Sequence, residues 1–145
     1  MATVQVPYPV VDLFAGPGGL GEGFASLTSE QGARRFESVV AIERDEFSYQ
    51  TLLLRHFLRR FPSDALPDDY YRFLRGEIDR GELFRRHKAE FAGASKSALK
   101  ISLGPEAHAV VKRLINQRIG RQCPSSEHLA QGAASISGVW TSSGG

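Results

Sequence analysis

The chain has 145 residues, of which 41% are hydrophobic, and this length and content suit one domain with a buried core. Its 18 basic and 16 acidic residues nearly balance, so composition alone indicates no nucleic-acid surface. A single cysteine excludes an internal disulfide, four scattered histidines indicate no metal site, and the apolar runs are too short to cross a membrane. Because the N-terminus shows no basic-then-apolar leader, we expect a cytoplasmic protein.

The first expected element is a short buried strand at 10–14, which a glycine-rich turn follows at once. Five glycines occupy the eight positions from Gly16 to Gly23, and a helix is expected from about Leu20 to Ser29. Such a turn exposes backbone N–H groups at a helix N-terminus, where a phosphate, carboxylate or ribose can approach closely. We interpret it as a ligand-binding loop, and a merely flexible loop is the alternative.

The second expected strand lies near Glu37–Ile42 and is followed directly by Glu43. A long helix is then predicted from about Glu46 to Phe61, with Asp45 as its N-cap. In a doubly wound sheet the ligand lies across the carboxyl ends of the first strands, where an acid can accept hydrogen bonds from both ribose hydroxyls. Glu43 is therefore the best single ligand-binding candidate. The alternative is a solvated acid favoured by the helix dipole.

Residues 63–103 show helical patterns and no evident strand. One helix is expected to begin at Pro67-Asp68-Asp69, and another to run from Ile78 to Phe91. We interpret this segment as a helical insertion between the second and third strands of the sheet. Its basic residues are Arg72, Arg75, Arg80, Arg85, Arg86 and Lys88. A solvated helix face offset by neighbouring acids is favoured over contact with the DNA backbone.

The sequence Gly104-Pro105-Glu106 predicts the start of a further helix, with proline at the first helical position, and Gly120 is its expected end. The apolar stripe of this helix is Val110, Val111, Leu114 and Ile115. Composition then changes to Ser, Gly, Ala and Gln, and we expect residues 122–145 to be a low-complexity, disordered tail. Within that tail only Ile136 to Trp140 has a weak strand pattern.

The glycine spacing alone fits more than one nucleotide-binding loop. A phosphate-binding Walker loop needs a lysine directly after its glycines, and the first lysine of this chain is Lys88, so that loop is excluded. Residues 16–21, Gly-Pro-Gly-Gly-Leu-Gly, match the dinucleotide fingerprint, although Pro17 is unusual inside it. An NAD-type Rossmann domain therefore remains an alternative.

The wider string from Asp12 to Phe24, Asp-Leu-Phe-Ala-Gly-Pro-Gly-Gly-Leu-Gly-Glu-Gly-Phe, resembles the first motif of DNA cytosine-5 methyltransferases, which bind S-adenosylmethionine. The strand at 38–42 followed by Glu43 resembles the second motif of that family, in which an acid closes the second strand. The resemblance implies an α/β, Rossmann-like, S-adenosylmethionine-dependent methyltransferase fold. The cofactor-binding residues that it implies are Asp12, Phe14, Ala15, Gly16, Gly18, Gly19, Leu20, Glu43 and Arg44.

Four of these residues have specific expected roles. Glu43 is expected to bind the ribose, and Phe14 to pack beside the ligand. Asp12 either buttresses the glycine turn or lies near the amino-acid end of the cofactor. Arg44 stands where the family often has an aromatic or apolar residue. Its aliphatic stem and planar guanidinium can stack on the adenine, and a surface charge is the alternative.

The catalytic part of the family pattern is absent from the sequence. Cytosine-5 methylation needs a cysteine thiolate that attacks C6 of a flipped-out cytosine. The family carries it in a Pro-Cys-Gln turn, followed by Glu-Asn-Val and Arg-x-Arg motifs, and none of these is present. Cys123 lies in the reverse order, Gln-Cys-Pro, and we interpret it as an incidental surface thiol.

We therefore expect residues 1–121 to form an incomplete cofactor-binding domain, the N-terminal part of a DNA cytosine-5 methyltransferase. A frameshift, a premature stop or a split gene would explain the change of composition that follows. DNA would be bound through the complete enzyme. The alternative is a non-catalytic S-adenosylmethionine-binding subunit, to which a partner chain supplies the catalytic half.

Overall fold

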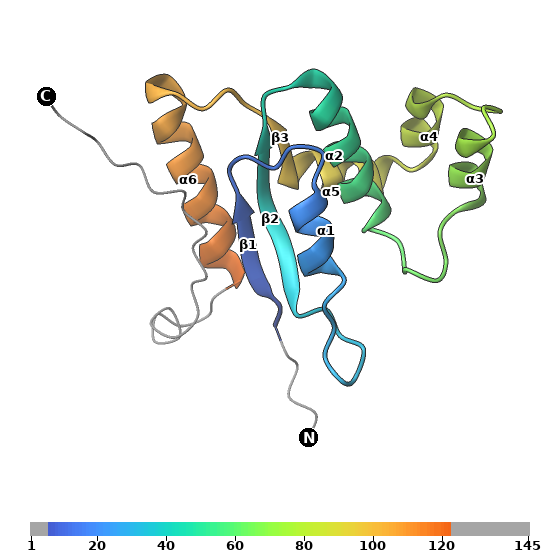
Figure 1. The fold of residues 1–145 in the computed structure, drawn as a ribbon, viewed down its shortest axis with the longest axis horizontal. Helices are drawn as coiled ribbons and strands as arrows, with labels where there is room; N and C mark the ends of the chain where they lie inside the picture. The colour runs from blue at the N-terminus through green and yellow to red at the C-terminus, as the bar shows by residue number, and fades with distance from the viewer. Residues whose placement is uncertain (1–5, 123–145) are drawn as a thin grey trace, which may run out of the picture.

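A computed structural model of the chain describes residues 6–122. This part is a mixed α/β arrangement with one sheet of three parallel strands and six helices (Figure 1). The elements in chain order are β1 (Tyr8–Asp12), α1 (Gly19–Ala25), β2 (Phe36–Glu43), α2 (Glu46–Leu58), α3 (Asp68–Leu74), α4 (Arg80–Arg86), α5 (Lys88–Ser97), β3 (Ala98–Lys100) and α6 (Pro105–Gln122).

The central strand of the sheet is β2. It pairs with β1 along the whole length of β1, with a shift of register between Val10 and Val11. On its other side, only the last three residues of β2 pair with β3. Since all three strands run in the same direction, their carboxyl ends meet at one edge of the sheet. We call this the carboxyl edge.

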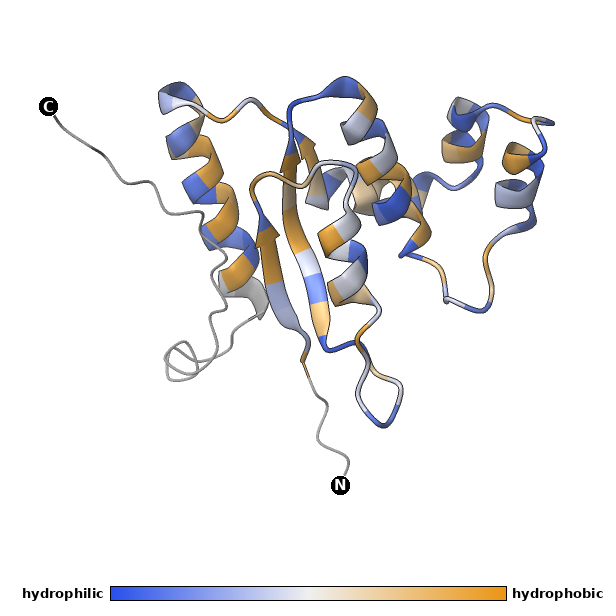
Figure 2. Cartoon of the chain, viewed as in Figure 1, coloured by the Kyte–Doolittle hydropathy of each residue, from blue (hydrophilic) through white to orange (hydrophobic). Residues whose placement is uncertain are grey.

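Side chains of β2 contribute to two hydrophobic clusters, one on each face of the sheet. Ala41 belongs to a cluster with Leu52 and Phe57 of α2, which extends to α4 and α5. The next residue, Ile42, belongs to a cluster with Val111 of α6. Helices α2 and α5 therefore cover one face and α6 covers the other (Figure 1), and the strands and the sheet-facing side of α6 are largely apolar (Figure 2).

The expected order of strand, turn, helix, strand and helix is confirmed for the first sixty residues. Helix α1 is shorter than expected, since it ends at Ala25, and α2 ends at Leu58 instead of Phe61. The N-cap prediction is confirmed, because the carboxylate of Asp45 accepts a hydrogen bond of 2.8 Å from the N–H of Ser48.

The expected single helix from Ile78 to Phe91 is wrong, because the structure has two helices that meet at His87. This residue caps both α4 and α5 with a non-helical backbone, φ −121° and ψ 59°. Its ring packs edge-on against Phe57 and Phe61, and its Nε2 lies 3.2 Å from a carboxylate oxygen of Asp69. Tertiary contacts of the ring thus accompany the break.

Strand β3 lies inside the segment in which the sequence showed no strand. It has three residues, Ala98-Leu99-Lys100, and two of them are poor strand formers. Pairing with β2 defines it, and the N–H of Ile101 continues the ladder to the Glu43 carbonyl at 3.1 Å. A helical segment does lie between β2 and β3, as expected, but it ends at Ser97 and not at residue 103, and the third strand follows it directly.

Helix α6 begins at Pro105 as expected and continues past Gly120 to Gln122, the last described residue. Of its expected apolar stripe, Val111 is buried, whereas Val110 is 44% exposed. The predictions for Cys123, for the strand pattern at 136–140 and for a disordered tail fall almost wholly outside the described residues.

Candidate cofactor site at the carboxyl edge

The glycine turn between β1 and α1 lies at the carboxyl edge. Gly16 and Gly18 have positive φ angles of 55° and 90°, a backbone conformation that favours glycine. At Gly18 an added Cβ atom would also lie 2.9 Å from Cδ1 of Leu52, a core side chain that would then have to shift. The turn is therefore pressed against α2 at Gly18 and open at Gly16 and Gly19, where no atom lies within 4 Å of an added Cβ.

The carboxylate of Glu43 joins this turn to the end of β2. Its Oε2 accepts a hydrogen bond of 2.8 Å from the N–H of Gly16. Its Oε1 accepts from the N–H groups of Arg44 and Asp45, at 2.8 and 2.7 Å. A second link is backbone only, from the N–H of Ala15 to the Ile42 carbonyl at 2.9 Å.

These bonds have a consequence for the predicted ribose contact. A carboxylate has about four lone-pair positions, and three backbone N–H groups occupy three of them. Glu43 is thus a structural brace of the turn, a role that the sequence analysis did not assign to it. One acceptor position remains for a ligand hydroxyl unless a backbone donor is shared.

Asp12 buttresses the turn, which is one of its two predicted roles. Its Oδ1 accepts a hydrogen bond of 3.2 Å from the N–H of Phe14, two residues further along the chain. This local bond is typical of an aspartate that starts a turn. It fixes the backbone where β1 ends and the glycines begin.

Large apolar side chains are exposed around this edge. Phe14 after β1 is 75% exposed, Leu20 in α1 is 55% exposed, and Phe47 in the first turn of α2 is 81% exposed. Exposed rings at the mouth of a turn favour a surface that a ligand or a partner covers. Phe14 was a candidate from sequence, whereas Phe47 was not, and its exposure is visible only in the fold.

Charged groups frame the same edge. Arg44 is exposed, and the backbone and hydroxyl hydrogen bonds of Ser48 hold the pKa of the neighbouring Asp45 carboxyl below its usual range. Lys100, at the end of β3, forms an ion pair with Glu46 in the first turn of α2 and lowers the pKa of that carboxyl. The end of β3 is thus connected to the first turn of α2.

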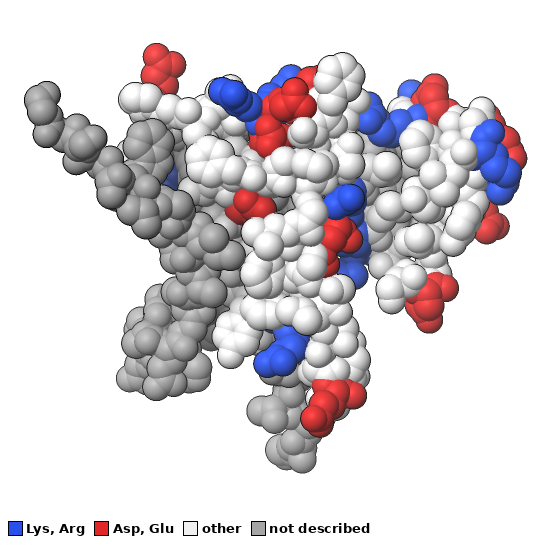
Figure 3. All heavy atoms as spheres, viewed as in Figure 1, with Lys and Arg blue, Asp and Glu red and all other residues white. Residues whose placement is uncertain are grey.

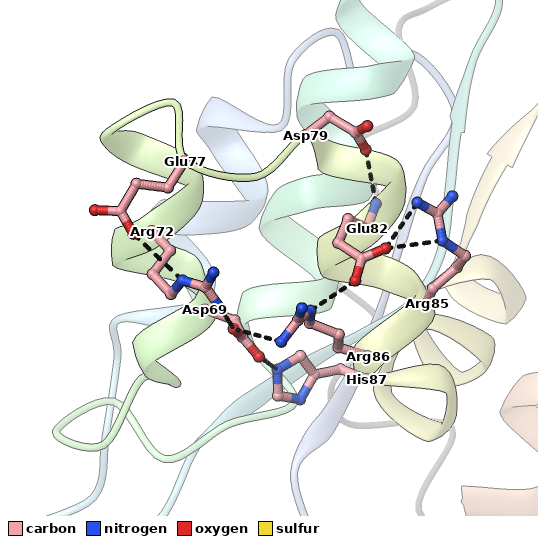
Figure 4. A network of polar contacts seen from close by, with 8 residues as sticks. All are labelled: Asp69, Arg72, Glu77, Asp79, Glu82, Arg85, Arg86 and His87. Carbon is pink, nitrogen blue, oxygen red and sulfur yellow. Dashed lines mark hydrogen bonds and ion pairs between the residues drawn. The ribbon is translucent and has the colours of Figure 1, made fainter.

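The basic residues of α3 and α4 are largely paired with acids. Figure 4 shows this network of polar contacts within residues 68–87. In it, Asp69 and Glu82 each form ion pairs with two arginines. Their N···O distances run from 2.8 Å for Arg85 and Arg86 with Glu82 to 3.5 Å for Arg86 with Asp69. On the face in Figure 3, basic and acidic residues alternate instead of forming one basic patch. These pairs favour the interpretation as a solvated face over that as a DNA contact.

Two other findings concern the kinds of site within residues 6–122. No group of three or more His, Cys, Asp or Glu side chains in this range is placed to hold a metal ion. None of the helices described is both long enough and apolar enough to span a membrane.

Comparison with known proteins gives no family assignment: no protein-family model, no curated protein and no solved structure matches this chain.

Proposed function

We propose that this chain is the S-adenosylmethionine-binding part of a DNA cytosine-5 methyltransferase, with an incomplete Rossmann-like sheet. The observation that carries the proposal is the hydrogen bond between Glu43 and the N–H of Gly16, 27 residues apart. It brings the acid of the second motif against the turn of the first, at the edge where α/β sheets bind nucleotides. The resemblance of both motifs to that family supplies the identity of the ligand.

The residues at the carboxyl edge fit this cofactor. The bare backbone at Gly16 and Gly19 admits close approach of the ligand, the remaining acceptor position of Glu43 suits a ribose hydroxyl, and the exposed ring of Phe14 suits the adenine. When bound, the cofactor supplies an electrophilic methyl group on its sulfonium. The residues of this chain bind and orient it; a thiolate and a base-binding surface for cytosine must come from elsewhere.

The course of α6 supports a position for a further strand of the sheet. The chain passes from β1 to β2 to β3 with α2 and α5 on one face, and α6 then returns on the other face toward β1. A right-handed crossover after α6 therefore delivers the next parallel strand to the outer side of β1, which has no strand partner within residues 6–122. That arrangement would place the glycine turn at the point where the strand order reverses, the usual position of a ligand.

The proposal is tested by calorimetric titration of the purified chain with S-adenosylmethionine, S-adenosylhomocysteine and NADH. We expect both adenosyl ligands to bind, and NADH to bind more weakly. Tighter binding of NADH would establish the dinucleotide alternative. Binding of none of the three by a chain with a cooperative thermal transition would overturn the proposal.

A second candidate function is the non-catalytic subunit completed by a partner chain. It is favoured by the outer side of β1, to which no strand among residues 6–122 is paired. It is tested by adding a separately expressed polypeptide that begins with a strand and a Pro-Cys-Gln loop. Methyl transfer to DNA by the mixture, and by neither chain alone, is the expected result for a complementing pair. Cofactor binding without any complementation would leave a binding module only.

A further inference from the structure

Helix α1 follows the glycine turn directly and has few features that would stabilise it in isolation. It has seven residues, of which Gly19, Gly21 and Gly23 are glycines, and none of the seven is buried. Its N-cap, Gly18, has no side chain that could accept a hydrogen bond from the first turn. Because glycine is a poor helix former and short helices are marginal in water, contacts with other elements must hold α1 in place.

Two side-chain contacts fasten α1 to the rest of the fold. The ring of Phe24 packs on the ring of Phe36, at the start of β2, with their centroids 5.1 Å apart. The carboxylate of Glu22 accepts at Oε1 from Nε of Arg59, at 2.9 Å, and also from Nη2. Arg59 directly follows α2, and its side chain is only 14% exposed, against 44% for Glu22. The ion pair thus joins the middle of α1 to the end of α2 and is partly shielded from solvent.

Two of the glycines make room for the approach of α1 to α2. A Cβ atom added at Gly21 would lie 3.3 Å from Nη2 of Arg59, closer than an ordinary van der Waals contact. The same addition at Gly18, three residues earlier, would lie 2.9 Å from Cδ1 of Leu52 in α2. By contrast, an added Cβ at Gly19 would meet no atom within 4 Å. The Arg59 guanidinium therefore lies against the backbone of α1, where a larger residue would displace it.

The third nitrogen of this guanidinium is not satisfied. Nη1 of Arg59 is buried and has no hydrogen-bond partner among residues 6–122. A buried donor without an acceptor costs free energy, and an apolar side chain of similar length would avoid that cost. The guanidinium is therefore not the most stabilising group for this position. What it provides is geometry, because Nε and Nη2 lie in one plane and converge on one oxygen of Glu22.

Backbone hydrogen bonds connect Glu22 to the glycine turn. The N–H of Glu22 donates to the Gly18 carbonyl at 3.0 Å, and the N–H of Gly18 donates to the Ala15 carbonyl at 2.9 Å. Helix α1 begins immediately after Gly18, so no flexible residue separates the helix from the turn. The segment from 15 to 22 is thus held at two places, by Glu43 at its beginning and by Arg59 at its end.

We propose that Arg59 is a positioning residue, which acts through Glu22 to hold α1 against α2 and so keeps the glycine turn in the shape found at the carboxyl edge. Arg59 follows the last residue of α2, whereas the first turn of α2 lies at that edge, so Arg59 acts without touching the ligand. Its effect on S-adenosylmethionine affinity rests on the proposed function. Its effect on the position of α1 does not.

The proposal is tested with Arg59→Met in the whole chain, a variant that keeps an unbranched apolar stem and removes every guanidinium donor. Amide hydrogen exchange is recorded by NMR. We expect the amides of Glu22 and Ser26, which are bonded within and around α1, to exchange about tenfold faster than in the unaltered chain. The amide of Tyr49 in α2 and the midpoint of urea denaturation should change little. Unchanged exchange of α1 would overturn the proposal.

A second variant tests the route through Glu22 and does not depend on a buried substitution. Glu22→Gln changes a side chain that is 44% exposed, and we expect it to accelerate exchange of α1 about threefold. In the double variant with Arg59→Met, exchange should be no faster than in Arg59→Met alone, since both changes remove one interaction. Additive effects would show that Arg59 does not act through Glu22, and would overturn the proposal.

Arg86→Met is the matched control, because it removes an arginine that forms an ion pair with Glu82 on α4. It should leave the exchange of α1 unchanged. If it accelerates this exchange as much as Arg59→Met does, the effect is a general loosening of the fold and the proposal fails.

Calorimetric titration with S-adenosylmethionine separates this proposal from the proposed function. We expect Arg59→Met to weaken binding about fivefold to tenfold at an unchanged urea midpoint, a result that a merely stabilising residue would not give. Faster exchange of α1 with unchanged affinity would overturn the role of Arg59 at the cofactor site. Absence of binding by the unaltered chain would overturn the proposed function alone, and the exchange of α1 would still decide whether Arg59 holds the turn.

Discussion

The carboxyl edge differs from the region between α1 and the end of α2 in how completely the protein satisfies its own hydrogen-bond donors. At the edge, one carboxylate, Glu43, accepts hydrogen bonds from three backbone N–H groups and closes a loop. Between α1 and the end of α2, Arg59 donates from Nε and Nη2 to one carboxylate oxygen of Glu22, and its buried Nη1 has no hydrogen-bond partner among residues 6–122. The first region is rich in donors that the protein itself satisfies, and the second retains a donor that it does not.

This difference determines which substitutions are expected to change the free energy of unfolding and which are expected to change ligand affinity. Glu43 contributes to the fold before any ligand arrives, so a substitution there changes stability and affinity together. Substitutions in the two regions are therefore expected to change stability and binding to different extents.

The largest effect is expected for Glu43→Ala, which removes the acceptor of three backbone N–H groups. We expect a loss of roughly 2 to 4 kcal/mol in the free energy of unfolding, measured by urea denaturation. Binding of S-adenosylmethionine should be lost at the same time. The control is Glu30→Ala, an exposed acid in the loop before β2, which should change stability by less than about 0.5 kcal/mol. A Glu43 variant as stable as this control would show that the brace is unimportant.

The free energy of unfolding is expected to depend on pH at acid pH through His56, which is buried beside Ser97. Burial first, and then the charges of Arg59 and Arg60, lower its pKa from 6.5 to about 3. Between these two values the unfolded chain binds a proton that the folded chain does not bind. Stability is therefore complete above pH 6.5 and falls as the pH drops below it, by up to about 1.4 kcal/mol for each pH unit.

The measurement is the free energy of unfolding at several pH values from 7.5 to 4.5. His56→Asn should lose the slope in this window even if its stability is lower throughout. The matched control is His108→Asn, since His108 is exposed on α6, and it should keep the slope of the unaltered chain. An unchanged slope in His56→Asn would mean that this histidine does not set the acid response.

An intermediate effect is expected at Gly18, where the turn presses on α2. Gly18→Ala places a methyl group at φ 90° and 2.9 Å from Leu52 Cδ1, and we expect a loss of about 1 to 3 kcal/mol. Gly19→Ala is the control one residue away, in open space and inside α1, and it should be neutral or slightly stabilising. Thermal melts of the two variants decide the matter, because equal melting temperatures would contradict the close packing of the turn.

The sequence predicts more of the carboxyl edge than of the other region, and the reason is physical. Local patterns predicted the order of β1, the glycine turn, α1 and β2, and the N-cap at Asp45, because the signal and the structure span the same few residues. They also placed Glu43 and the glycine turn at one edge, since parallel strands bring their carboxyl ends together. They did not reveal that Glu43 braces Gly16, which depends on the exact approach of two loops.

Other features had no local signal. Strand β3 has three residues and exists through its pairing with β2, and the helix break at His87 accompanies contacts with residues of α2 and α3. Arg34, His56 and Ser97 come from separate elements and line one small cavity of about 40 Å³. Nothing in their spacing along the chain predicts that they lie close together. Contacts between distant residues are therefore the part of this molecule that only the fold shows.

The smallest effect on stability is expected for Phe14. At this residue the effect on the free energy of unfolding and the effect on cofactor affinity should differ most. Its ring is 75% exposed, so Phe14→Ala should change the free energy of unfolding by less than about 0.5 kcal/mol. If the ring packs on the adenine, the same substitution should weaken S-adenosylmethionine binding about tenfold. Tyr71→Ala removes another exposed ring, on α3, and serves as the control that leaves affinity unchanged. Calorimetric titration of both variants distinguishes a ligand-facing ring from an exposed one without a role: equal affinities would remove Phe14 from the site while leaving the brace at Glu43 intact.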